Sequence, residues 1–364
     1  MVKSLRLIDF LLILGTFPTL AGFGLPPTLV LGAYGDSGAQ SVAPSSGSPY
    51  GDLLIDGLFG WRQALGPGRY LALSASGSLS RYLITLSGFE DYEHFDAQLG
   101  LPSGENTFIL GGGIASSVTN QTSTGSFAWP YWSAAYQLAR GKLGYRSTFE
   151  YRGSYLYEPA PSNDHFTEGV RYTLDHLTNI RLETYAILDG SWELWNQQPI
   201  LASNGSATSA FRQDYLAALT LGAKGILGYY LDWRAEASGG LRLSDADTNQ
   251  YLATASQYEA NSESRASGRA SASLTWSPTR SFSMSVSANL GDELYLSRKA
   301  VTSAGALTSE SLNVLSTGGG LRLSWTPNGK VYLVLKSALS RSFSPDPNYA
   351  QWSLDASGGV QYSF

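Results

Sequence analysis

Cysteine is missing from this 364-residue sequence, and charged residues are scarce. Without cysteine there can be no disulfide framework, and no thiol that would accept a lipid at a cleavage site. Charged residues make up 15% of the chain, whereas soluble globular proteins usually contain about 25%. The formal net charge of −5 argues against nucleic acid, and against an anionic membrane surface, as a partner.

Long hydrophobic runs are also missing after the N-terminal region. No segment there contains the roughly 18 consecutive apolar residues that a membrane-spanning helix needs. A sequence that is poor in charge yet has no apolar runs is typical of alternating membrane strands, because each strand contributes its apolar residues one at a time. The 40 glycines and 22 tyrosines agree with that interpretation.

Residues 1–21 have the features of a secretory signal peptide. Lys3 and Arg6 provide a positively charged start, residues 10–17 form an apolar stretch, and Thr19-Leu20-Ala21 fits a small-x-small cleavage site. A transmembrane anchor is the alternative, but the apolar stretch is too short for one. Cleavage would remove two basic residues and one acidic residue, which changes the net charge from −5 to about −6. We therefore expect an exported protein that is not a lipoprotein.

The last strand of the chain alternates almost without error. Successive side chains of a β-strand point to opposite faces, and here one face is apolar or small while the other is polar. Counted back from the C-terminus, the first face consists of Phe364, Tyr362, Val360, Gly358, Ala356, Leu354 and Trp352. A strand of a soluble sandwich could alternate in the same way, so the length and number of such runs must decide.

The same alternation recurs in long runs, for example at residues 142–157, 180–195, 228–243 and 281–297. These runs have about 14 to 16 residues, whereas a globular strand averages about 5 to 6 and a tilted strand crosses a bilayer in about 9 to 11. Short and long connections alternate between them, as in membrane barrels with short periplasmic turns and long extracellular loops. Short connections are expected at 139–141, 177–179, 225–227, 277–279 and 327–330, and longer ones near 36–50, 118–128, 196–210, 244–262 and 298–310.

This pattern predicts an all-β protein whose residues 22–364 form a single transmembrane, antiparallel, up-and-down β-barrel of about 16 strands. Dropping one pair among the first four strands would give 14. Aromatic residues gather near both ends of the expected strands, where a barrel leaves the hydrocarbon. The strands are expected to start near residues 27, 50, 69, 86, 105, 129, 142, 165, 180, 211, 228, 263, 279, 310, 330 and 350.

Together, the leader, the amphipathic strands, the alternating connections and the terminal phenylalanine resemble the bacterial outer-membrane β-barrel superfamily. The resemblance covers residues from about 27 to 364 and is one of pattern, without the motif of a particular porin family. It implies the outer membrane of a Gram-negative bacterium, contact with its lipid, and insertion by the barrel-assembly machinery with periplasmic chaperones. The assembly signal would consist of Trp352, Val360, Tyr362 and Phe364. Trimers are common among porins, but no stretch of this sequence identifies an oligomer face.

The polar face of the strands carries charges of both signs. A charge on the lipid side costs roughly 2–4 kcal/mol near the membrane midplane, so we expect these residues to line an interior, either as a salt-bridged network or as a polar conduit. A barrel of 14 to 16 strands is too wide for side chains alone to fill. The leading hypothesis is a water-filled, weakly selective pore for small polar solutes or ions. Its lining would include Arg146, Glu150, Arg152, Arg171, Arg181, Glu183, Asp189, Arg212, Asp214, Asp232, Arg234, Glu236, Arg265, Arg269, Arg322, Lys336 and Asp355.

Two other functions deserve comparison with the pore. An outer-membrane hydrolase would need a histidine with Ser or Asp, and the chain has only His94, His165 and His176. His94 lies in the acidic segment 90–96 and could hold a divalent cation or act as an Asp-His base, but a solvated charged loop is the simpler interpretation. His165 is expected to begin a strand, with a solvated loop as the alternative, and His176 is expected at a membrane interface. No catalytic or phosphate-binding motif occurs, so we expect no enzyme activity, metal or cofactor.

The third possibility is a surface that binds a partner. The longest expected loop, residues 245–262, is polar and contains Tyr251 and Tyr258. Loops of this length are also expected simply as solvated caps of a barrel. The sequence favours the pore over both alternatives.

Overall fold

The computed structural model describes residues 28–43, 46–82, 89–119, 126–139, 141, 144–158, 164–201, 206–246, 248–252, 257–260 and 263–363. Within these residues, sixteen antiparallel strands form one closed barrel, and two short strands form a separate sheet. The prediction of about 16 strands is therefore confirmed, and the alternative of 14 is not. No helix in the described part of the chain is long and apolar enough to cross a membrane.

The strands of the barrel are long. They are β1 (Thr28–Ala43), β2 (Ser46–Gly66), β3 (Arg69–Tyr82), β4 (Phe89–Ser103), β5 (Asn106–Thr119), β6 (Phe127–Gln137), β7 (Tyr145–Leu156), β8 (His165–Asn179), β9 (Leu182–Leu201), β10 (Ala207–Leu227), β11 (Leu231–Ser244), β14 (Arg265–Thr279), β15 (Phe282–Val301), β16 (Leu307–Trp325), β17 (Val331–Phe343) and β18 (Trp352–Ser363). Every strand starts within four residues of its predicted position. The alternation of side chains was sufficient to locate them.

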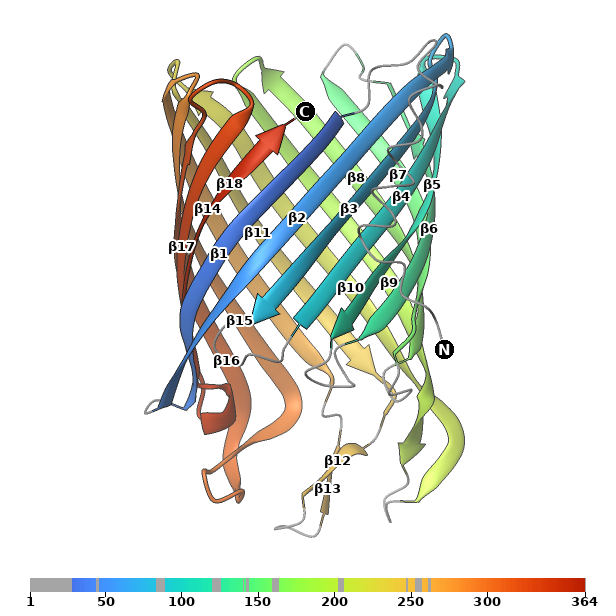
Figure 1. The fold of residues 1–364 in the computed structure, drawn as a ribbon. Coiled ribbons are helices and arrows are strands. Elements are labelled where there is room, and N and C mark those ends of the chain that lie inside the picture. Colours follow the sequence, from blue (N-terminus) through green and yellow to red (C-terminus); the bar gives the residue numbers. More distant parts are fainter. Residues whose placement is uncertain are drawn as a thin grey trace.

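Each barrel strand pairs with its neighbours along the chain, and the barrel closes where β1 pairs with β18 (Figure 1). In this seam Val30 lies opposite Ser363, and Ser41 lies opposite Trp352. Closure satisfies the backbone groups of what would otherwise be two free sheet edges. The topology is the predicted up-and-down barrel.

Short turns and long connections lie at opposite ends of the barrel. The short turns are at the end where the C-terminus lies, at the top of Figure 1. Gly68 and Gly329 occupy turns there with φ of 69° and 76°, a conformation that glycine adopts at no steric cost. Three predicted turns, 177–179, 225–227 and 277–279, belong instead to β8, β10 and β14. These strands keep alternating up to the rim, so the chain turns two to three residues later than predicted.

The long connections carry small elements of their own. A short 3-10 helix, η3 (Pro347–Tyr349), connects β17 to β18. The longest predicted loop contains a two-stranded sheet of β12 (Thr248–Leu252) and β13 (Gln257–Ala260), which projects below the barrel in Figure 1. The sequence analysis did not predict this sheet.

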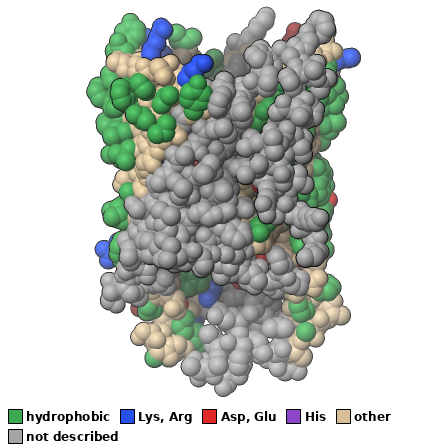
Figure 2. Space-filling view, in the orientation of Figure 1, with side chains coloured by type: hydrophobic (Ala, Val, Ile, Leu, Met, Phe, Trp, Pro, Cys, Tyr) green, Lys and Arg blue, Asp and Glu red, His purple; other side chains and the backbone are tan. Residues whose placement is uncertain are grey.

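The outer surface of the barrel is apolar. Large hydrophobic side chains of the described residues face outward, and Figure 2 shows them along both flanks. Val170 on β8 is 62% exposed, and Leu335 and Leu339 on β17 are 53% and 56% exposed. Such a surface is too extensive for a soluble monomer, but a lipid bilayer covers it.

The interior lacks the dry core of a soluble protein. Among the described residues, the buried hydrophobic side chains are mostly alanines, and the larger ones are Tyr295, Leu312 and Val334. None of the described tryptophans belongs to this buried set. A sandwich with tryptophans packed between its sheets is therefore excluded.

Candidate functional site: the inner wall of the barrel

Cross-strand register determines which residues face the interior. Residues directly opposite each other on paired strands share a face, and the exposed leucines and valines define the outward one. By this criterion sixteen of the predicted lining residues lie on the inward side of barrel strands. Arg181 does not, because it lies in the turn between β8 and β9. Whether the inward residues line a conducting pore stays a prediction.

The inward side of β7–β11, which we call the paired wall, is covered with ion pairs between adjacent strands. Arg146 on β7 contacts Asp175 on β8 at 2.8 Å. Asp189 on β9 accepts from Arg152 at 2.6 Å and from Arg171 at 2.7 Å. The side chains of Arg152 and Arg171 are only 35% and 36% exposed, so side chains that reach into the barrel are held against its wall.

The paired wall continues over β9–β11 with two further ion pairs. Lys224 lies 3.5 Å from Glu183, and Arg234 lies 2.9 Å from Glu236. Lys224 and Arg234 stand directly opposite each other, a like-charge arrangement that is normally destabilising. Because each has its own carboxylate, the repulsion is offset.

Tyrosine rings lie flat on this wall over glycines. The Tyr185 hydroxyl donates to Glu236 Oε2 at 2.5 Å and accepts from Arg234 at 3.2 Å. A Cβ added to Gly222 would meet the Tyr185 ring at 2.1 Å. Glycine therefore allows the ring to rest on the backbone of the next strand instead of standing in the lumen. Tyr70 covers Gly100 in the same way.

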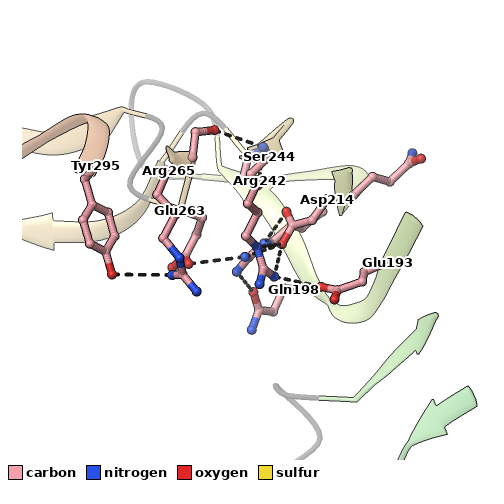
Figure 3. A network of polar contacts seen from close by, with 12 residues as sticks. Glu193, Gln198, Asp214, Arg242, Ser244, Glu263, Arg265 and Tyr295 are labelled. Atoms are coloured by element: carbon pink, nitrogen blue, oxygen red, sulfur yellow. Dashed lines mark hydrogen bonds and ion pairs between the residues drawn. The ribbon is translucent and has the colours of Figure 1, made fainter. Parts of the chain in front are cut away.

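At the long-loop end, the paired wall finishes in a buried cluster that we call the rim network (Figure 3). Its members are Glu193, Gln198, Arg212, Asp214, Arg242 and Glu263. Asp214 has no exposed side-chain surface and contacts two guanidinium groups, that of Arg212 at 2.6 Å and that of Arg242.

The outer members of the rim network complete its charge balance. Arg242 reaches Glu193 at 2.8 Å, and Arg212 reaches Gln198 at 3.0 Å and Glu263 at 3.4 Å. The Arg212 guanidinium also lies 4.5 Å from the centre of the Trp195 ring. Buried charges persist only when they are paired and hydrogen-bonded. The network therefore fixes β9, β10 and β11 and the segment before β14 to one another.

His94 lies in strand β4, on the inward face, and not in a solvated loop as expected. Its Nε2 is 2.7 Å from the Tyr131 hydroxyl, which donates to Asp96 Oδ1 at 2.9 Å. Because that hydroxyl proton points at Asp96, His94 Nε2–H donates to the Tyr131 oxygen. The three residues help to line a cavity of about 910 Å³ in the inner wall, together with Trp129 and Arg152.

The other histidines take part in ring stacking. His165 is the first residue of β8, as predicted, and stacks on Trp195 with ring centres 4.3 Å apart, so the alternative of a solvated loop does not hold. His176 faces outward beside the short turn and stacks on Tyr145 at 4.1 Å, as the interface interpretation requires. In the described ranges no group of three or more His, Asp or Glu residues could hold a metal ion.

The inward side of β14–β17, which we call the hydroxyl wall, differs from the paired wall. Between Arg265 and the short-turn end of the barrel, its cations are Arg269, Arg322 and Lys336. The side chains between them are small and mostly carry hydroxyl groups. They are Ser271, Ser273 and Thr275 on β14, and Ser285, Ser287 and Asn289 on β15.

Sequence reasoning missed the inward aromatic residues. Trp129 and Tyr131 were not identified because both faces of β6 carry aromatic rings, so alternation does not assign a face. Tyr185 could have been found, since it alternates with Glu183 and Asp189. Tyr70 was expected in an outward girdle near a short turn, but it faces inward, with Arg62 3.9 Å above its ring centre.

Comparisons with known proteins identify no family for this chain. No protein-family description matches the sequence, and no curated protein matches it. The structure is similar to a bacterial polysaccharide outer membrane secretin, with TM-score 0.49 and 13% identity over 92% of this chain and 98% of that one. It is also similar to OmpT of Vibrio cholerae, with TM-score 0.47 and 8% identity over 93% of this chain and 98% of that one. A third similar structure is OccK8 (OprE) of Pseudomonas aeruginosa, with TM-score 0.46 and 11% identity over 94% of this chain and 99% of that one.

These similarities are too distant to support a function, so the fold must be argued from the chain itself. A closed barrel of sixteen long antiparallel strands, apolar outside and ionic inside, is the architecture of transmembrane β-barrels. Only closed barrels and helices satisfy all backbone groups within lipid. The chain therefore has the fold of a transmembrane β-barrel.

Proposed function

We propose that this protein is a passive, water-filled pore for small polar solutes or ions. The observation that carries the proposal is the closed sixteen-stranded barrel whose inward side bears ionisable side chains. Barrels of this size are wide enough to hold an aqueous channel. Ionised groups require water or partners, and many inward side chains of the described strands are well exposed.

The arrangement of charge supports weak overall selectivity. On the paired wall each cation contacts an acid within 4 Å, so much of its field is cancelled before it reaches a passing solute. A lumen with neutralised charges of both signs discriminates poorly between ions. The passage of solutes needs no cofactor or chemical step.

Single-channel recording tests the pore directly. Purified, refolded protein inserted into planar bilayers should give discrete conductance steps, and liposomes that contain it should swell in iso-osmotic solutions of small sugars. Folding is verified first by a far-UV circular dichroism spectrum typical of β-strand. Heat-denatured protein from the same preparation is the control. Folded barrels that insert but never conduct would contradict the proposal.

Export and assembly form a separate part of the proposal. Residues 1–21, which lie outside the described residues, would act as a cleaved signal peptide. The terminal signal of Trp352, Val360, Tyr362 and Phe364 would recruit the barrel-assembly machinery, with periplasmic chaperones upstream. Phe364 is also outside the described residues. N-terminal sequencing of mature protein should begin at Gly22, and deletion of Phe364 should lower the amount of folded barrel in the outer membrane.

Binding of a partner by the long connections is the second candidate. It is favoured by the β12–β13 sheet, which gives the loop between β11 and β14 a structure of its own and places Tyr251 opposite Tyr258. Removing residues 247–262 should then abolish cell adhesion or ligand capture while conductance is kept. No arrangement of the three histidines offers a comparable reason to propose a hydrolase.

A further inference from the structure

The strongest unexplained feature of the inner wall is a pair of like charges. Arg322 on β16 and Lys336 on β17 are directly opposite each other, and both face inward. Cations in this position repel and destabilise a sheet. On the paired wall, Lys224 and Arg234 are opposed in the same way, but Glu183 and Glu236 neutralise them. Arg322 has no ion pair or hydrogen bond within the described residues.

A second guanidinium on the same wall is also without an acid. Arg269 on β14 is exposed, and among the described residues it makes no ion pair or hydrogen bond. Its cross-strand neighbours are Ser238 and Gly291, which cannot neutralise it. Arg265, the next inward cation on β14, differs because it lies 3.9 Å from Glu293.

The surroundings of Arg269 form a polar hollow. Its volume is about 450 Å³, and its lining includes Ser238, Ser267, Gly291, Ser316 and Glu293. The Ser316 hydroxyl donates to the Gly291 carbonyl oxygen at 3.3 Å, and a Cβ on Gly291 would meet that hydroxyl at 2.7 Å. The donors that line this hollow are the Arg269 guanidinium and the Ser238 and Ser267 hydroxyl groups, and its acids are Asp292 and Glu293.

The wall between the two arginines carries no acid. Arg322 lies opposite Ser285, which lies opposite Thr275 on β14. Thr275 is six residues further along β14 than Arg269. At about 3.4 Å per residue, this places the two levels roughly 20 Å apart. Serine, threonine, asparagine, glycine and alanine fill the inward positions of β14–β17 between them, apart from Lys336. The nearest inward acids are Glu293 on β15, beyond the level of Arg269, Glu236 and Asp232 on β11, and Asp355 on β18.

We propose that the hydroxyl wall is an anion path, on which Arg269 and then Arg322 hold the carboxylate or phosphate group of a small solute as it crosses the barrel. Guanidinium groups offer planar donor pairs that match both oxyanions, and the hydroxyl groups between them replace part of the water of the anion. This inference rests on the proposed pore and adds the sign of its selectivity. Because Arg322 has no acid of its own among the described residues, its position opposite Lys336 is kept by the solute, which neutralises Arg322.

The experiment measures ion preference and anion binding in the same bilayers. Reversal potentials in a KCl gradient should show chloride permeating more readily than potassium through the unmodified protein, and inorganic phosphate should reduce the chloride current in a saturable way. Arg269→Gln and Arg322→Gln should each weaken phosphate affinity about fivefold, since each removes one solvated charge contact. The double variant should lose the anion preference.

Matched variants separate this role from a general effect of charge. Arg341→Gln removes one positive charge from an outward position on β17, and Arg171→Gln removes one from the paired wall; both should keep phosphate affinity within about twofold. Arg322→Lys should retain most of the preference because the charge remains. Circular dichroism and resistance to proteolysis confirm folding of each variant.

The outcomes distinguish this inference from the proposed function. If the unmodified protein never conducts, the proposed pore function is wrong, and the proposed anion path is wrong as well. If it conducts but prefers cations, or if phosphate affinity is the same in both arginine variants as in the unmodified protein, the anion path is wrong while the pore stands.

Discussion

The two sides of the barrel interior use the same residue type in opposite ways. On the paired wall, Arg146, Arg152 and Arg171 contact carboxylates of neighbouring strands, one strand away for Arg146 and Arg171 and two strands away for Arg152. On the hydroxyl wall, Arg269 and Arg322 face serines, glycines and a lysine. A guanidinium bound to an acid braces neighbouring strands, whereas one without an acid can interact with a solute. The pairing of charges, more than their number, therefore determines what a lumen attracts.

The difference originates in what alternates with arginine along each strand. Arg212 and Asp214 are two residues apart on β10, and Arg234 and Glu236 are two apart on β11, so acid and base share a face. On β14 the residues two positions from Arg269 are Ser267 and Ser271. In these pairs a local spacing cancels the charge, whereas Arg146, Arg152 and Arg171 depend on acids of other strands.

The largest expected effect comes from breaking the rim network. Asp214→Ala leaves Arg212 and Arg242 close together and buried, with the carboxylate that they share removed. Loss of one partner of a buried ion pair costs about 3–5 kcal/mol, so the urea midpoint of the refolded barrel should fall markedly. Asp232→Ala is the control. This exposed acid makes no ion pair among the described residues, and its loss should change stability by about 0.5 kcal/mol or less.

The next effect concerns the ring that lies flat on the paired wall. Gly222→Ala places a Cβ inside the Tyr185 ring, so the ring must swing into the lumen and abandon Glu236. Overpacking of this kind costs about 1–3 kcal/mol, and single-channel conductance should decrease. Gly268→Ala on β14 has open space around the added Cβ and should leave conductance unchanged. Equal conductance in both variants would show that Tyr185 does not move.

A third change converts the paired wall into a copy of the hydroxyl wall. Asp189→Asn removes the carboxylate that Arg152 and Arg171 share, so two guanidinium groups become available to solutes. We expect the permeability ratio of chloride to potassium to rise about fivefold, because one solvated charge contact with an anion has an effect of about that size. Reversal potentials measure this ratio. A ratio equal to that of the unmodified protein would mean that pairing has no influence on selectivity.

The smallest expected effect is a gain in stability on the hydroxyl wall. Arg322→Gln removes the repulsion from Lys336, which is directly opposite. Relief of a like-charge pair should raise the free energy of unfolding by about 0.2–1 kcal/mol, measured by urea titration in the absence of phosphate. Added phosphate should stabilise the unmodified protein more than the variant. A loss of stability in Arg322→Gln would contradict the idea that the pair is kept for binding.

The sequence predicts the strands of this fold well because a membrane barrel encodes them locally. Alternation with a period of two is sustained over each strand, and turn residues separate the strands, so all sixteen starts could be located. Arg181 was assigned to the wall because alternation alone does not tell where a strand stops and a turn begins. The β12–β13 sheet lies in a polar loop, where the apolar signal is missing.

The site was predictable only in part, since facing inward is a local property and pairing is not. Alternation placed Arg171 and Asp189 inside, but their contact depends on the register between β8 and β9. The rule that charges avoid the lipid side also has exceptions near the long-loop rim. Glu168 faces outward opposite Trp192 and accepts from the Tyr151 hydroxyl at 2.8 Å. A carboxylate costs little at that depth, which explains why the rule fails there.

The seam between β1 and β18 has a consequence for how the protein is made. The two partners of this seam come from the beginning and the end of the described chain, so the cylinder cannot be sealed until the final strand has been delivered. Contacts so distant along a polypeptide form slowly, and until then both margins offer unpaired backbone to any passing strand. The incomplete barrel must stay extended until then, and its closure at the membrane is a single late event.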